Sequence, residues 1–165
     1  YTATATTTVT SSGAILTPTT LFSGTSVGSN TIVANDLAVG DTIKVKLKGY
    51  LNVSVIGVFA FDIQLGGSIL ASNSNILISH PKTNSLIDIE FEFTVRTIGV
   101  SGTVIGQGAI HVSNALGGAT PTIIQLVQTS TTTIDTTNSN LLDFLINWDA
   151  GFNGNINITN STIEK

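Results

Sequence analysis

Two stretches of this chain alternate apolar and charged residues with a period of two. In Asp41–Tyr50, the apolar residues Ile43, Val45 and Leu47 alternate with Lys44, Lys46 and Lys48. In Leu86–Ile98, a second apolar set alternates with Asp88, Glu90, Glu92 and Arg96. Side chains on a strand alternate between its two faces, so this pattern is typical of an antiparallel sheet with one buried and one solvated face.

The rest of the chain also reads as strands joined by turns. No segment carries a sustained helical period, and Gly66-Gly67 separates two apolar runs in the manner of a two-residue hairpin. We expect eight to ten strands in an all-β, antiparallel two-sheet sandwich, most simply a jelly roll. Residues 1–18 are a Thr-rich tract that predicts an extended N-terminal arm or stalk, and residues 19–165 form the jelly-roll head domain.

The composition limits the classes of function that this chain can have. Only 10% of the residues are charged while 41% are hydrophobic, so oligomerisation is one way to cover apolar surface. A net charge of −4 provides no basic field for nucleic acid. No apolar run approaches the roughly 20 residues that span a bilayer, so we expect no membrane insertion.

The sequence carries no recognisable catalytic motif. It lacks cysteine, and it contains no G-x-S-x-G, H-E-x-x-H or P-loop pattern. Asp88, Glu90 and Glu92 share one strand face and would suit acid/base chemistry or a hard cation, but ion pairing with the lysine row explains them better. His111 is read as a surface or core-edge histidine. We therefore expect no enzyme activity, no cofactor and no metal site.

Three segments, in order, resemble the head domain of virion fibre and tail-associated structural proteins, found mostly in tailed bacteriophages. They are Thr20–Gly49 (TLFSGTSVGSNTIVANDLAVGDTIKVKLKG), Phe91–Gly108 (FEFTVRTIGVSGTVIGQG) and Thr133–Asp149 (TIDTTNSNLLDFLINWD). The resemblance implies a trimeric jelly roll of the tumour-necrosis-factor/C1q type, carried on the virion surface by an N-terminal stem. It transfers no catalytic residues. The short Thr-rich arm departs from the coiled-coil or collagen-like stems of many such fibres.

The expected function is thus a non-enzymatic virion surface protein, a fibre head or capsid decoration. The alternative is a carbohydrate-binding or adhesin-type β-sandwich of a cell-surface or secreted protein, which would need an exposed aromatic platform. We expect Trp148 in the core with Phe144 and Ile146, whereas a Trp148 that serves as a glycan-binding platform would favour the alternative.

The expected partners are a second and third copy of the chain, other virion proteins through the arm, and a host-surface glycan or protein. Val55–Leu65 reads as apolar on both faces, which predicts a cover on each side. The threefold interface is therefore assigned to Phe59, Phe61, Ile63, Leu141 and Leu145. Host contact is assigned to the predicted loops Ser72–Asn75, His80–Asn84 and Asn114–Thr120, with Asn73, Asn75, His80, Lys82, Asn84 and Asn114 as contact residues.

Overall fold

The computed structural model describes residues 2–3, 7–12, 18–22, 29–79, 81–113, 121–148 and 153–165. Within these ranges the chain forms β-strands, turns and irregular segments, and no helix. The strands are β1 (Thr2–Ala3), β2 (Thr7–Ser12), β3 (Thr19–Thr20), β4 (Thr31–Ile32), β5 (Thr42–Val53), β6 (Gly57–Leu65), β7 (Ser68–Ile78), β8 (Lys82–Thr97), β9 (Gly102–Val112), β10 (Thr122–Val127), β11 (Thr132–Ile134), β12 (Asn140–Trp148) and β13 (Asn153–Glu164).

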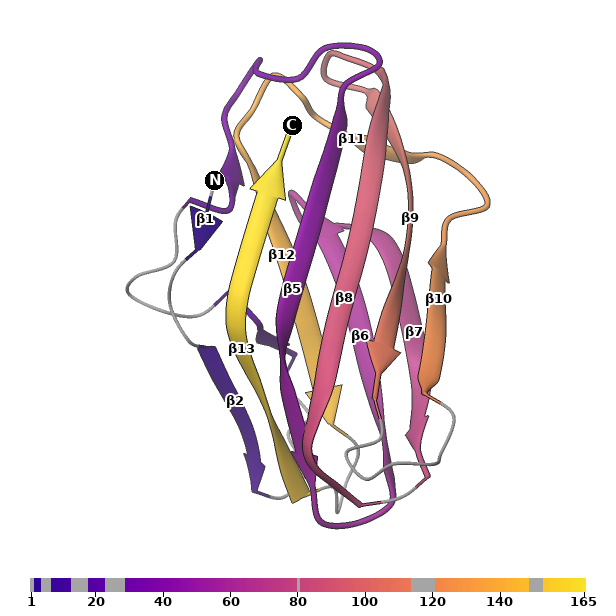
Figure 1. The fold of residues 1–165 in the computed structure, drawn as a ribbon. Helices are drawn as coiled ribbons and strands as arrows, with labels where there is room; N and C mark the ends of the chain where they lie inside the picture. The colour runs from indigo at the N-terminus through magenta and orange to yellow at the C-terminus, as the bar shows by residue number, and fades with distance from the viewer. Residues whose placement is uncertain are drawn as a thin grey trace.

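The strands form two sheets that face each other (Figure 1). The larger sheet has the order β1-β13-β5-β8-β9-β10, with β2 also paired to β13 and β11 to β9. The smaller sheet has the order β3-β12-β6-β7, with β4 also paired to β12. All of these pairings are antiparallel.

The pairing is nested from the ends of the chain inward. β2 pairs with β13, β3 and β4 pair with β12, β5 pairs with β8, and β6 pairs with β7. A long antiparallel ribbon rolled up in this way is a jelly roll. β9, β10 and β11 are inserted between β8 and β12, and they extend the larger sheet beyond β8. The predicted fold class is therefore confirmed.

The two alternating stretches lie side by side as β5 and β8. Lys44 pairs with Glu92, Lys46 with Glu90 and Lys48 with Asp88 in the register of the two strands. The apolar residues between them are buried, because a period of two sends every second side chain into the sandwich. Slipping the register by one residue would expose this whole apolar set, so the pattern fixes the pairing.

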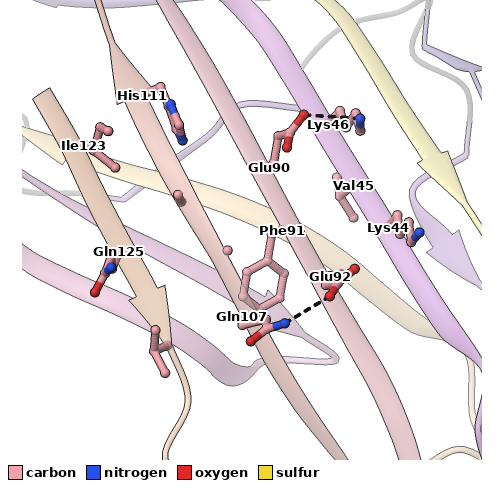
Figure 2. Close-up of a pocket in the computed structure, with 13 residues that line it drawn as sticks. Lys44, Val45, Lys46, Glu90, Phe91, Glu92, Gln107, His111, Ile123 and Gln125 are labelled. Carbon is pink, nitrogen blue, oxygen red and sulfur yellow. Dashed lines mark hydrogen bonds and ion pairs between the residues drawn. The ribbon is translucent and has the colours of Figure 1, made fainter. Parts of the chain in front are cut away.

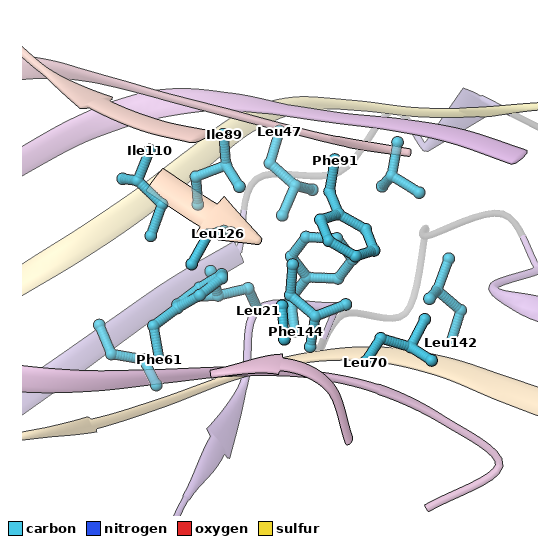
Figure 3. Packing of buried hydrophobic residues seen from close by; sticks show 14 of the residues in the cluster. Leu21, Leu47, Phe61, Leu70, Ile89, Phe91, Ile110, Leu126, Leu142 and Phe144 are labelled. Carbon is cyan, nitrogen blue, oxygen red and sulfur yellow. The ribbon is translucent and has the colours of Figure 1, made fainter. Parts of the chain in front are cut away.

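The core fills the space between the two sheets and is built largely from aromatic and branched aliphatic side chains (Figure 3). Phe144 on β12 is fully buried, and its ring lies 5.5 Å from that of Phe22, 5.8 Å from Phe61 and 6.5 Å from Phe91, between ring centroids. Trp148 is also buried, with its ring 5.5 Å from that of Phe59. The predicted core position of Trp148 with Phe144 and Ile146 is confirmed.

Glycine is required at two places where the backbone geometry demands it. Gly66 and Gly67 form the β6–β7 turn with φ of 57° and 81°, the positive values that the predicted hairpin needs. On β9, a Cβ at Gly106 would collide with the Phe91 ring, and one at Gly108 would collide with the Glu90 carbonyl oxygen. The predicted close approach at these two glycines is confirmed.

Three expectations about segments need correction. Thr7–Ser12, predicted as part of a separate arm, lies along β13 as strand β2 of the larger sheet. Ser72–Asn75 and Lys82–Asn84, predicted as loops, belong to strands β7 and β8. Their Asn, Ser and Thr residues are typical of turns, but pairing with β6 and β5 overrides that local preference.

Within the described ranges, the chain has no helix with the length and apolarity of a membrane span.

Candidate functional site: a groove on the larger sheet

A groove of about 560 Å³ crosses the outer face of the larger sheet (Figure 2). It spans four neighbouring strands, β5, β8, β9 and β10. The polar side chains that line the groove project from the solvated face of these strands. The polar lining residues are Lys44, Lys46, Glu90, Glu92, Gln107, His111 and Gln125.

Strand register explains why this face is hollow. Lys46, Glu90, Ala109 and Gln125 form one row across the four strands, since each residue is the pairing partner of the next. Ala109 has the short side chain in the middle of this row, and Gln107 and His111 flank it along β9. The longer side chains therefore form the walls above a floor made by Ala109 and the backbone of Gly108.

Two polar contacts hold the carboxylates of the groove. Lys46 Nζ lies 3.2 Å from Glu90 Oε1, and Gln107 Nε2 donates a hydrogen bond of 3.1 Å to Glu92 Oε1. In the neighbouring row, Lys48 Nζ lies 3.2 Å from Asp88 Oδ2. The predicted cross-strand pairing is confirmed for Lys46 and Lys48. The Lys46–Glu90 side chains are about half exposed, so this pair orients its groups more than it stabilises the fold.

A smaller hollow of about 180 Å³ continues along β8 and β9 past Glu92 and Gln107, which line both spaces. Gln128 lines its far side. The Gln128 side chain accepts a 2.5 Å hydrogen bond from Gly106 N and donates one of 2.5 Å to Thr132 Oγ1. The Glu92–Gln107 hydrogen bond thus lies between two connected parts of one polar surface.

The β10 wall of the groove is apolar. Ile123 and Val127 are 58% and 61% exposed, respectively, on the same outer face as Gln125.

His111 lies directly opposite Asp88 in the β8–β9 register, a juxtaposition that sequence spacing did not reveal. Among the described residues, no three His, Cys, Asp or Glu side chains gather into a group suited to a metal ion.

The residues assigned to a threefold interface divide into two groups. Phe59, Phe61 and Ile63 are at most 1% exposed and point into the sandwich core, so their assignment to an intersubunit surface is wrong. Leu141 and Leu145 point outward from the smaller sheet, and Leu141 is 48% exposed. The outer face of β6 carries Val58, Ala60, Asp62 and Gln64, all half-buried.

The residues assigned to host contact do not form one loop cluster. Asn73 and Asn75 lie on β7, where Asn73 Oδ1 accepts a 3.0 Å hydrogen bond from Asn75 N. Lys82 is buried at 6% exposure, which corrects its assignment as an exposed loop cation. Asn84 is exposed on β8, and its backbone N–H donates a 2.7 Å hydrogen bond to Asn52 Oδ1. His80 and Asn114, with the rest of Asn114–Thr120, lie outside the described residues.

A separate pocket of about 320 Å³ lies between β4, the start of β5 and the end of β13. Lys165 in its wall lies 3.0 Å from Asp41 Oδ2, between Nζ and the carboxylate. The backbone N–H of Ala38, at 2.7 Å, and then Lys165 lower the pKa of the Asp41 carboxyl. These contacts fasten the β4–β5 turn to the C-terminal strand.

No family model matches this chain, and no curated protein matches it. Among solved structures, it is similar to the CBM2 module of the evolved Dit protein of Lactobacillus casei BL23 phage J-1. The sequence identity is 14% and the TM-score 0.30, over 82% of this chain and 68% of that module.

Proposed function

We propose that this chain is a non-enzymatic structural protein of a virion surface, the head domain of a fibre or a capsid decoration. The observation that carries the proposal is the nested jelly-roll topology. It is the fold implied by the resemblance of Thr20–Gly49, Phe91–Gly108 and Thr133–Asp149 to fibre heads. Jelly rolls recur in viral capsid proteins, where rigid sandwiches present loops and faces to neighbours.

The proposed assembly is a homotrimer that uses the outer face of the smaller sheet. In the described part of this face, Leu145 on β12 pairs with Asp62 on β6, and Leu141 lies beside the β6–β7 turn, where its carbonyl oxygen accepts a 2.9 Å hydrogen bond from Gly66 N. Asp143 also lies on this described face, which carries no lysine or arginine. The charged residues of β5 and β8 instead project from the opposite face of the sandwich. Interface cores are depleted of charge relative to the rest of a protein surface, which favours the smaller sheet as the contact.

Asp62 is a carboxyl group that an interface on this face would have to accommodate. Burial raises the pKa of the Asp62 carboxyl, on a strand face where a solvated aspartate would normally be well hydrated. A further loss of water at an interface would favour its neutral form still more. The proposed trimer therefore tolerates this residue best when it is protonated.

The proposed interface is tested by introducing glutamate on the outer face of the smaller sheet and, separately, on the outer face of the larger sheet. Leu141→Glu combined with Leu145→Glu should convert the trimer to monomers, because carboxylates would be buried without partners. Ile123→Glu, on the opposite face and 58% exposed, is the matched control and should remain trimeric. Trimers that persist in the double variant would reject this face as the interface.

The location is tested separately by immunogold labelling of purified virions with antibodies against the domain. Regular labelling of the particle surface is expected. Labelling confined to host cells would instead support the second candidate function, a carbohydrate-binding or adhesin-type module of a cell-surface or secreted protein. The observation that favours this second candidate is the polar groove on the larger sheet.

A further inference from the structure

We propose that the groove on the larger sheet binds a neutral oligosaccharide, through Gln107, Gln125 and His111 with the apolar wall of β10. This inference deepens the second candidate function and rests on the groove being a binding site. It does not depend on whether the domain is carried by a virion or by a cell.

The size and placement of the groove suit a small polar ligand. Its volume of about 560 Å³ lies within the range of roughly 300–1,000 Å³ that is typical of ligand sites. All its walls stand on paired strands rather than on loops. The backbone of a paired sheet is already ordered, so none of the interaction energy is spent on ordering a loop.

The chemistry of the walls matches a sugar ring, which has hydroxyl groups at its edge and C–H groups on its faces. Amide and imidazole groups both donate and accept hydrogen bonds, as hydroxyl groups require. Gln107 donates to Glu92 through Nε2, which leaves its carbonyl oxygen available as an acceptor toward the groove. Ile123 and Val127 offer an exposed apolar surface on the β10 side for the C–H groups.

The charges of the groove favour a neutral ligand over a polyanion. The lining contains two lysines, Lys44 and Lys46, and two glutamates, Glu90 and Glu92, so the formal charges cancel. Lys46 is moreover paired with Glu90 at 3.2 Å. A uronic acid or phosphate group would meet as many carboxylates as ammonium groups, and like-charge contacts cost affinity.

The test is binding of the purified domain to an array of neutral and acidic oligosaccharides, with each hit followed by isothermal titration calorimetry. Gln107→Ala combined with Gln125→Ala should weaken binding by at least about tenfold, the loss expected from two hydrogen bonds. Ala109→Leu should abolish binding, because it fills the groove floor without removing a polar group. Asn160→Ala, which removes an exposed amide on β13 outside the groove lining, is the matched control and should bind as the parent does.

Each variant is first compared with the parent by circular dichroism and native mass, so that a folding defect is not mistaken for a lost contact. Binding of a neutral oligosaccharide that Ala109→Leu leaves unchanged would overturn the assignment to this groove. Binding of acidic oligosaccharides alone would overturn the neutral ligand class. An array with no hit would overturn the inference itself, while leaving the virion proposal to the immunogold experiment.

Discussion

Phe144 should be the most costly single residue to truncate in this domain. Its ring is fully buried between the sheets and contacts the rings of Phe22, Phe61 and Phe91. Truncating a buried phenylalanine to alanine costs about 3–5 kcal/mol of unfolding free energy. Each aromatic pair adds about 0.5–1.5 kcal/mol beyond area burial, so Phe144→Ala should lie at the upper end, about 4–5 kcal/mol. For a chain of this size, that lowers the Tm by about 8–20 °C.

The assay is urea unfolding at one fixed protein concentration, followed by tryptophan fluorescence. Trp148 is the single tryptophan of the chain and is buried, so its emission reports the core directly. Ile123→Ala, on the exposed face of β10, is the control and should change the unfolding free energy by no more than about 0.5 kcal/mol. A loss under about 2 kcal/mol for Phe144→Ala, at an unchanged urea dependence, would refute the packing argument.

Three further outcomes are expected. Trp148→Ala should cost about 3–5 kcal/mol in chemical unfolding followed by circular dichroism; a normally folded variant that loses only glycan binding would identify Trp148 as a binding platform instead. Because the pKa of the Asp62 carboxyl is raised in the folded state, its charged form opposes folding above that pKa. Asp62→Asn should therefore raise the Tm at pH 7. This gain in Tm should disappear as the pH falls through the titration range of the Asp62 carboxyl. A thermal scan that shows no gain at pH 7 would contradict the burial of this carboxyl. Gly108→Ala should prevent normal folding, because its Cβ would collide with the Glu90 carbonyl oxygen. The Cβ of Gly67→Ala would meet no atom within 4 Å, so the stability loss of this variant should come only from the backbone strain of its positive φ. Equal solubility and equal Tm for the two variants would contradict the close approach at β9.

Much of the fold could be predicted because the strong signals are local. The alternation in Asp41–Tyr50 and Leu86–Ile98 predicted the buried faces and ion pairing between the lysine and carboxylate rows, which the structure shows as the Lys46–Glu90 and Lys48–Asp88 pairs. The Gly66-Gly67 turn was equally clear, since few other dipeptides adopt positive φ at both positions. Weakly patterned polar segments were less predictable: Ser72–Asn75 lies on β7 only because β6 pairs with it.

The predicted sites failed where function depends on pairings between distant strands. Phe59, Phe61 and Ile63 looked available to a partner, because the sequence does not show which face of β6 meets the second sheet. Lys82 looked exposed beside Pro81, yet pairing with Val53 places it at the start of a buried strand. The groove was missed for the same reason. Only the combined register of β5, β8, β9 and β10 brings Lys46, Glu90, Ala109 and Gln125 into one row.

The proposed trimeric virion protein is tested most directly by the mass of the purified domain in solution. Multi-angle light scattering at micromolar concentration should give about 51 kDa, three times the 17.1 kDa of one chain. The measured mass should stay the same when the protein is diluted, as expected for a large apolar interface. A mass of about 17 kDa across the same concentrations would contradict the account.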